Sequence, residues 1–133
     1  MMNRNWRIFF RWMLIVYLIG VALLCLLNLS NLGGMPQTIF GFPSDKVAHF
    51  LMYVPLPLLA YWGFYVKRGK PMRIVGFLLI IMTAGMVLGG GIELLQGLSG
   101  YRSCDILDFR ADCLGLAVSV FGILLYSAFS RNW

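Results

Sequence analysis

Apolar residues fill four long runs of this chain, and short polar stretches separate them. The runs extend over residues 8–29, 44–66, 73–97 and 105–129. A helix needs about 20 apolar residues to cross the hydrocarbon core of a membrane, and each run reaches that length. The pattern predicts an all-α fold, a polytopic membrane four-helix bundle that occupies residues 1–133 as a single domain.

Two of the runs contain residues that would weaken a helix in water. Pro55 and Pro57 lie in the middle of the second run, and each removes a backbone donor, so we expect a kink there. Gly85 and Gly89 in the third run have the GxxxG spacing that lets helices approach closely. Ser44 is expected to be the N-cap of the second helix.

The composition agrees with a lipid environment. Hydrophobic residues make up 60% of the chain and charged residues 12%, whereas a soluble domain is about a quarter charged. This balance excludes a soluble enzyme, a nucleic-acid-binding module and a disordered tail. Cys25, Cys104 and Cys113 form no CxxC spacing, so neither a zinc site nor a disulfide framework is expected.

The net charge of +6 predicts orientation rather than nucleic-acid binding. Most basic residues fall at alternate helix ends, which is the pattern of the positive-inside rule. All four tryptophans fall near the same ends. Both termini are therefore expected on the cytoplasmic side (N-in/C-in). The residues that carry this prediction are Arg4, Arg7, Arg11, Lys67, Arg68, Lys70, Arg73 and Arg131, with Trp6, Trp12, Trp62 and Trp133.

The acidic residues fall at the opposite helix ends, together with the single histidine. Ionisable groups inside a membrane are costly, so we expect them to face the bundle interior and one another. Helical spacing aligns several of them on shared faces. The sequence predicts an outward-facing polar pocket between the second, third and fourth helices. Its members are Asp45, Lys46, His49, Tyr53, Glu93, Gln96, Arg102, Asp105, Asp108 and Asp112.

Simpler roles remain open for some of these residues. Asp105 is suited to cap the fourth helix, and Asp45 is suited to the first turn of the second, where the helix dipole favours an acid. Arg110 is expected on the opposite face from Asp108, reaching toward headgroups. The whole set could instead be a polar clasp that holds the helices together.

Three ordered motifs resemble the signature of the VanZ family of small bacterial membrane proteins. They are D-K-V-A-H at 45–49, E-L-L-Q at 93–96 and R-S-C-D-I-L-D-F-R-A-D-C-L-G at 102–115. The chain departs from the family pattern at Asp112, where an asparagine is usual. The resemblance implies a multi-pass protein of the bacterial inner membrane with a role at the cell envelope. The family is named for a protein linked to low-level resistance to the glycopeptide teicoplanin.

The favoured hypothesis is that the pocket binds a membrane lipid or a lipid-linked headgroup, such as a cell-wall precursor. Arg102 and Lys46 would contact a phosphate. The remaining ligand-binding candidates are Tyr53, Glu93, Gln96, Asp105 and Asp112.

Two other classes stay open. An intramembrane enzyme would use His49 as a general base paired with Asp45 or Asp108. It could depend on a metal, because histidine and carboxylates suit divalent ions. A small transporter or proton relay would require a homo-oligomer. We expect no cofactor and no bound metal.

Overall fold

The computed structural model describes residues 3–26, 37–64, 71–100 and 104–130. This part of the chain is all-α apart from one short hairpin, as the sequence predicts. The helices are α1 (Arg4–Leu26), α2 (Ser44–Tyr53), α3 (Pro55–Gly63), α4 (Pro71–Leu98) and α5 (Ile106–Phe129); the hairpin strands are β1 (Thr38–Ile39) and β2 (Phe42–Pro43).

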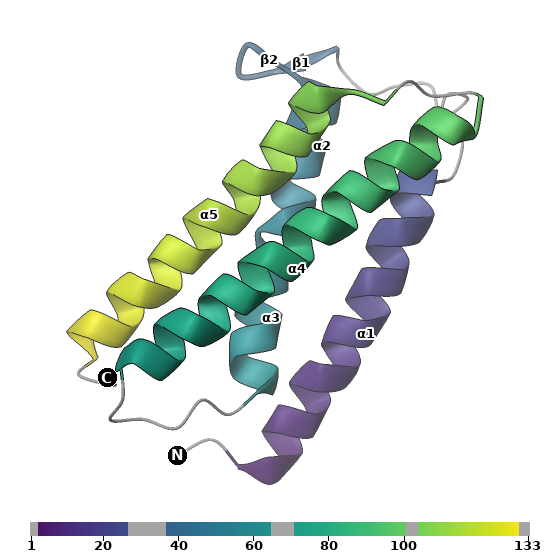
Figure 1. Ribbon diagram of the computed structural model, residues 1–133. Helices are drawn as coiled ribbons and strands as arrows, with labels where there is room; N and C mark the ends of the chain where they lie inside the picture. The colour runs from purple at the N-terminus through teal and green to yellow at the C-terminus, as the bar shows by residue number, and fades with distance from the viewer. Residues whose placement is uncertain (1–2, 27–36, 65–70, 101–103, 131–133) are drawn as a thin grey trace.

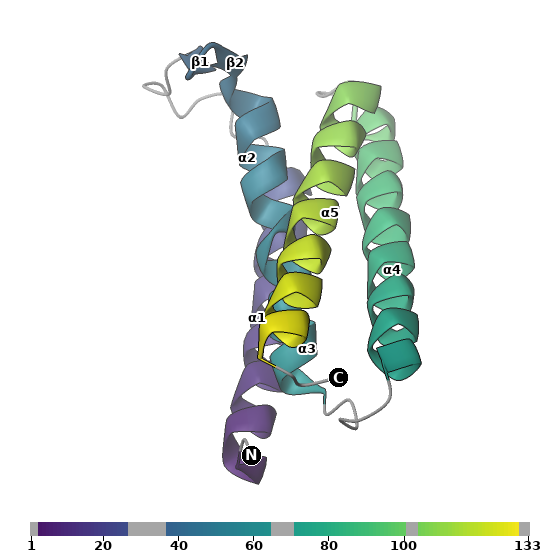
Figure 2. The same cartoon turned by 90° about the vertical axis from the view of Figure 1, so that its left-hand side faces the viewer.

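The helices run alternately up and down (Figure 1). α1 rises, α2 and α3 descend in line with one another, α4 rises and α5 descends, so both chain ends lie at the same end of the bundle. α2 packs mainly on α5 and α1 mainly on α3, while α4 packs on α5. The view from the side shows the hairpin above α2, at the end opposite the chain termini (Figure 2).

The second apolar run is divided at Val54. This residue keeps helical torsion angles (φ −60°, ψ −44°), and Pro55 begins α3 directly after it. The break places Pro55 and Pro57 in the first turn of α3, where backbone N–H groups have no acceptor within the helix. The expected kink is therefore confirmed, and neither proline removes a bond that α3 would otherwise make.

The prediction that Ser44 caps the second helix is wrong by one residue. Pro43 is the N-cap and Ser44 is the first residue of α2. The hairpin explains the shift, because Thr38 pairs with Pro43 and the backbone N–H of Ser44 donates to the Gln37 carbonyl oxygen at 3.2 Å. The strand thus continues up to the helix and leaves no residue between them.

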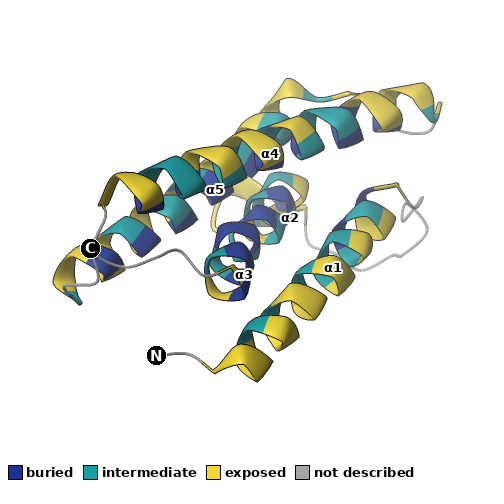
Figure 3. Ribbon diagram, turned by 60° about the horizontal axis from the view of Figure 1, so that its bottom comes forward, coloured by how far each residue is buried: buried dark blue, intermediate teal, exposed yellow. Residues whose placement is uncertain are grey.

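In the described part of the chain, three helices are long and apolar enough to cross a membrane: α1 with 23 residues, α4 with 28 and α5 with 24. The second run does not qualify as one span, since its break yields helices of 10 and 9 residues. The outer faces of the long helices are exposed (Figure 3), and many of the exposed residues on them are large and apolar. On α4, for example, Ile80 is 67% and Val87 71% exposed. Such surfaces suit lipid rather than water.

Glycines bring α5 close to its neighbours. A Cβ atom at Gly85 would lie 2.7 Å from a methyl carbon of Leu116, so this glycine lets α4 approach α5. A Cβ atom at Gly115 would overlap the carbonyl oxygen of Phe50 in α2. Both contacts lie near an apolar core that includes Tyr53, Ile92 and Leu116.

Candidate functional site

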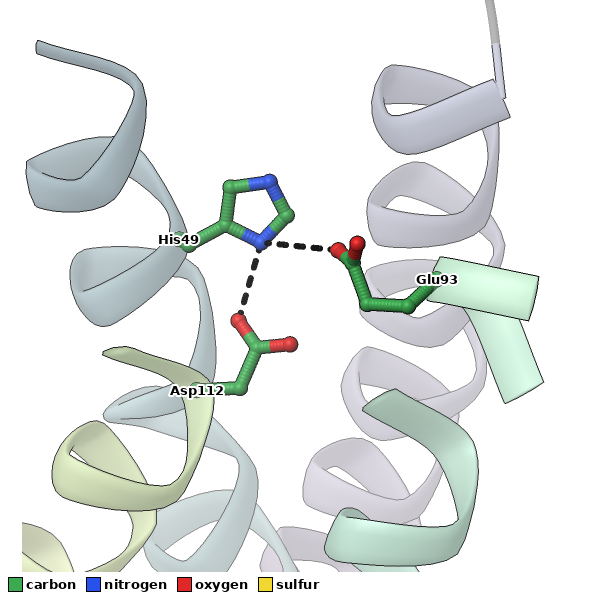
Figure 4. Close-up of side chains that lie close together, drawn as sticks. All are labelled: His49, Glu93 and Asp112. Carbon is green, nitrogen blue, oxygen red and sulfur yellow. Dashed lines mark hydrogen bonds and ion pairs between the residues drawn. The ribbon is translucent and has the colours of Figure 1, made fainter. Parts of the chain in front are cut away.

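Three buried ionisable residues meet where α2, α4 and α5 come together. We call His49, Glu93 and Asp112 the acid–histidine centre. Nδ1 of His49 lies 3.0 Å from Oδ1 of Asp112 and 3.9 Å from Oε1 of Glu93. Their exposed fractions are 3%, 3% and 1%. Figure 4 shows the imidazole with Nδ1 facing both carboxylates.

The sequence folds locally to bring these groups together. Gly89 lies one helical turn before Glu93 on α4, and a Cβ atom there would lie 3.0 Å from Oδ2 of Asp112 and 3.3 Å from the Tyr53 hydroxyl. Gly115, one turn after Asp112, allows α5 to touch the backbone of α2 beside His49. The absence of side chains at the two glycines therefore sets the spacing of the centre.

A second group surrounds Lys46 and lies nearer the helix ends. We call Lys46, Asp45, Asp105 and Asp108 the lysine cluster. The Lys46 ammonium lies 2.7 Å from Oδ2 of Asp105, 2.7 Å from Oδ1 of Asp108 and 3.2 Å from Oδ2 of Asp45. Lys46 thus joins the start of α2 to the start of α5.

Asp105 has the predicted capping role and a further one. Its side chain accepts a hydrogen bond from the backbone N–H of Leu107 at 2.8 Å, so it is the N-cap of α5. Its own backbone N–H donates to Oε2 of Glu93 at 3.1 Å. The hydrogen bond from Lys46 holds the pKa of the Asp105 carboxyl below its usual value, and the bond from Leu107 adds to this shift.

The two groups are adjacent. Nε2 of His49 lies 3.7 Å from Oδ2 of Asp108, whose other oxygen accepts from Lys46. Together the groups contain five carboxylates, one ammonium and one imidazole. Negative charge is therefore in excess, and the site favours ligands that bring positive charge or hydrogen-bond donors.

One of the two predicted partners of His49 lies beside it, and a nearer carboxylate was not predicted as its partner. The enzyme hypothesis pairs His49 with Asp45 or Asp108; Oδ2 of Asp108 lies 3.7 Å from Nε2, and Asp112 lies within hydrogen-bond distance of Nδ1. Asp45 is exposed and contacts Lys46 instead. The helical face that should hold Asp45, His49 and Tyr53 is buried at His49 and Tyr53, and Asp45 lies at its solvent edge.

Two further predicted residues lie beside the centre. The side-chain amide of Gln96, 1% exposed, donates to the Cys25 carbonyl oxygen at 2.7 Å, so it ties α4 to the end of α1. The Tyr53 hydroxyl is buried and has no hydrogen-bond partner among the described residues. Arg110 is exposed, as expected. Arg102 lies outside the described residues.

Sequence reasoning did not single out Tyr17. Its hydroxyl is buried without a hydrogen-bond partner in the described part of the chain, and its ring packs against the core that contains Tyr53. The available signal was the spacing of Tyr17, Val21 and Cys25, which places all three on one face of α1.

Among the described residues, two sets of side chains are spaced to hold a metal ion. They are His49, Glu93 and Asp112, and Asp45, Asp105 and Asp108; in each set, one potential ligand atom per residue lies within 4.8 Å of the others. The Lys46 ammonium already bonds to all three members of the second set. The acid–histidine centre is therefore the candidate metal site.

Comparison with known proteins finds a relative of this chain. Over 83 residues it is 32% identical to the uncharacterized protein C11E3.10 of Schizosaccharomyces pombe, and the match covers 62% of this chain and 48% of the yeast protein. The chain thus spans about half the length of that relative. No protein-family model matches the chain, and no solved structure does.

Proposed function

We propose that this chain is a VanZ-like multi-pass membrane protein that binds the polar headgroup of a membrane lipid, or of a lipid-linked envelope precursor. The binding end is where α2, α4 and α5 bring the acid–histidine centre and the lysine cluster together. The resemblance noted in the sequence supports the bacterial inner membrane as the location, while the yeast relative belongs to a eukaryote.

Charge at the far end of the bundle supports an N-in/C-in orientation. Arg4, Arg7 and Arg11 lie in the first turns of α1, and Arg73 lies in the first turn of α4. These turns share one end of the bundle (Figure 1). Trp6, Trp12 and Trp62 lie on the same half and are partly or largely exposed, as interfacial tryptophans are. The site then faces the outside.

One observation carries the binding proposal: a buried acceptor in the site lacks a donor. Oε1 of Glu93 has no hydrogen-bond partner among the described residues, although the residue is 3% exposed. A clasp that only joined helices would favour full pairing, because an unpaired buried acceptor costs about 1–3 kcal/mol. A headgroup with hydroxyl or ammonium donors would satisfy Glu93.

The site gives no support to the phosphate contact that the sequence predicts for Lys46. Three aspartates already surround its ammonium. We therefore propose that the donor groups of the headgroup, rather than its phosphate, meet these protein side chains directly.

Native mass spectrometry tests the binding of lipid. The full chain in mild detergent with EDTA is mixed with phosphatidylethanolamine or with phosphatidylglycerol, and the lipid adducts are counted. Wild-type protein and Gly122→Ala, whose added Cβ meets no described atom within 4 Å, should retain lipid equally, whereas Glu93→Gln should retain at least about tenfold less. Equal retention by Glu93→Gln, with an unchanged circular dichroism spectrum, would overturn the proposal.

An intramembrane enzyme is the second candidate, because the buried His49–Asp112 pair at 3.0 Å suits acid–base chemistry. Asp112 would orient the imidazole, and the imidazole would take a proton from the attacking group. Incubation of the protein with labelled phospholipids and separation of the products tests this candidate. Turnover that disappears in His49→Gln would support it, and no turnover by the wild type would reject it.

A further inference from the structure

The acid–histidine centre has an arrangement of atoms that hydrogen bonding alone does not satisfy. Each of three helices contributes one residue, and each residue is at least nine-tenths buried. One ligand atom from each lies within 4.8 Å of the other two. In Figure 4 the Nδ1 atom and the two carboxylates point toward a common space.

Two buried polar atoms at this place lack partners in the described part of the chain. One is Oε1 of Glu93, which is directed at Nδ1 of His49 but lies 3.9 Å from it. The other is the hydroxyl of Tyr53, which is 1% exposed. A Cβ atom at Gly89 would lie 3.3 Å from that hydroxyl and 3.0 Å from Oδ2 of Asp112, so both oxygen atoms lie against this glycine. The centre therefore gathers more oxygen atoms than it has donors.

The charge of the centre is also unbalanced. Glu93 and Asp112 bring two carboxylates against one imidazole. The nearest described ammonium, on Lys46, bonds to three other carboxylates. Uncompensated carboxylates in an apolar interior are costly, and a divalent cation would neutralise both.

We propose that His49, Glu93 and Asp112 bind one divalent transition-metal cation, with Nδ1, Oε1 and Oδ1 as its ligand atoms. One imidazole nitrogen and two carboxylate oxygens form a donor set that suits Zn²⁺ or Mn²⁺ better than the softer Cu(I). Three protein ligands leave a coordination position open, as in zinc sites that bind a substrate.

The surroundings of the imidazole fit this role. Metal-bound histidines usually donate the second ring N–H to a carboxylate, a carbonyl or water, which fixes the tautomer. When Nδ1 binds the metal, the proton resides on Nε2, and Nε2 faces Oδ2 of Asp108 at 3.7 Å. Lys46 holds the other oxygen of Asp108 at 2.7 Å and so positions this carboxylate.

The metal site deepens the proposed function, because a headgroup would bind at its open coordination position. Only that step rests on the proposed function. In the metal-free centre headgroup donors meet Oε1 of Glu93, whereas in the metal-bound centre that oxygen ligates the cation and a headgroup oxygen, including one of phosphate, takes the open coordination position. Metal binding itself needs no lipid, so the two proposals fail independently.

Zinc titration of the lipid-free full chain tests the site. Protein in detergent is stripped with EDTA, dialysed and titrated with Zn²⁺ in a calorimeter, and its metal content is measured by mass spectrometry. The wild type should bind one equivalent. Glu93→Gln and Asp112→Asn should bind at least about tenfold more weakly, since even the loss of an outer partner costs about 10–100-fold.

Asp45→Asn is the matched control, because Asp45 belongs to the other acidic set and is exposed. It should bind Zn²⁺ like the wild type. A wild type that binds no zinc, or a Glu93→Gln variant that binds as tightly as the wild type, would overturn the proposal. So would an equal loss in Asp45→Asn.

A second measurement keeps the test valid if a variant fails to fold. Wild-type protein loaded with Co²⁺ should show weak visible bands without the strong near-ultraviolet bands of thiolate ligands. It should also melt at a higher temperature than the EDTA-treated protein, because a ligand that binds the folded state stabilises it. Thiolate bands that vanish in Cys104→Ser would assign the metal to the exposed Cys104 instead and overturn the proposal.

Discussion

Nδ1 of His49 lies 3.0 Å from Oδ1 of Asp112, although 63 positions separate the two residues. The contact joins α2 to α5, the two helices that pack most extensively on each other. It lies directly above the place where Gly115 touches the carbonyl oxygen of Phe50. Close helix packing and the polar contact therefore depend on the same short stretch of α5.

Replacement of Gly115 by alanine should separate α2 from α5. The added Cβ would overlap the Phe50 carbonyl oxygen, and because backbone cannot move aside as a flexible side chain can, we expect a loss of about 1–3 kcal/mol. Gly122→Ala is the control on the same helix, since nothing lies within 4 Å of a Cβ there. Thermal unfolding in detergent measures both. Equal melting temperatures for the two variants would contradict the close contact.

Lys46→Met should destabilise the end of the bundle that holds the site. It leaves Asp105 and Asp108 close together without the ammonium that bonds to both. We expect a loss of about 1–3 kcal/mol, which is limited because the lysine side chain is 21% exposed. Arg110→Met, on the exposed face, should change stability by less than about 0.5 kcal/mol.

Addition of Asp108→Asn to Lys46→Met should recover part of the lost stability, since it removes one of the two opposing charges. The melting temperature of the double variant measures this recovery. A double variant that is less stable than Lys46→Met alone would argue against charge repulsion as the cause.

Gln96→Leu should loosen the end of α1. The substitution removes the amide that donates to the Cys25 carbonyl oxygen at 2.7 Å, at a cost of about 1–2 kcal/mol. Hydrogen exchange of the α1 residues around Val21 should become faster. Ser99→Ala, which removes a hydrogen bond within the end of α4, should leave exchange in α1 unchanged. Equal exchange in wild type and Gln96→Leu would disprove the tie between the helices.

Cys104 offers a direct test of orientation. It is exposed at the polar end, whereas Cys25 is buried. A membrane-impermeant maleimide should label Cys104 in intact cells. Arg73→Cys, placed at the opposite end in a Cys104→Ser background, should be labelled only after the membrane is permeabilised. The reverse pattern would invert the proposed topology.

The sequence predicts depth and helical face well, because both follow from spacing along one helix. Asp105 caps α5 as expected, and the helix break falls at the predicted prolines. The buried positions of Glu93 and Asp112 also follow from the cost of acids in lipid. These predictions need no knowledge of how the helices pack.

The pairing of side chains between helices could not be read in the same way. It depends on how far each helix is rotated and how closely it approaches, which glycines and the hairpin set together. His49 therefore meets Asp112 rather than Asp45, and Gln96 reaches α1 rather than the centre. Lys46 pairs with three aspartates. Spacing along each helix did not predict these pairs and suggested other roles for the aspartates.

The most direct test of the convergence of buried polar groups is a double-mutant cycle between His49 and Asp112. His49→Leu, Asp112→Leu and the double variant are unfolded in detergent, and their free energies of unfolding are compared with that of the wild type. The double variant should be more stable than the sum of the single losses predicts, by about 1–3 kcal/mol. Losses that add to within about 0.5 kcal/mol would show that the two side chains do not interact and would contradict the site.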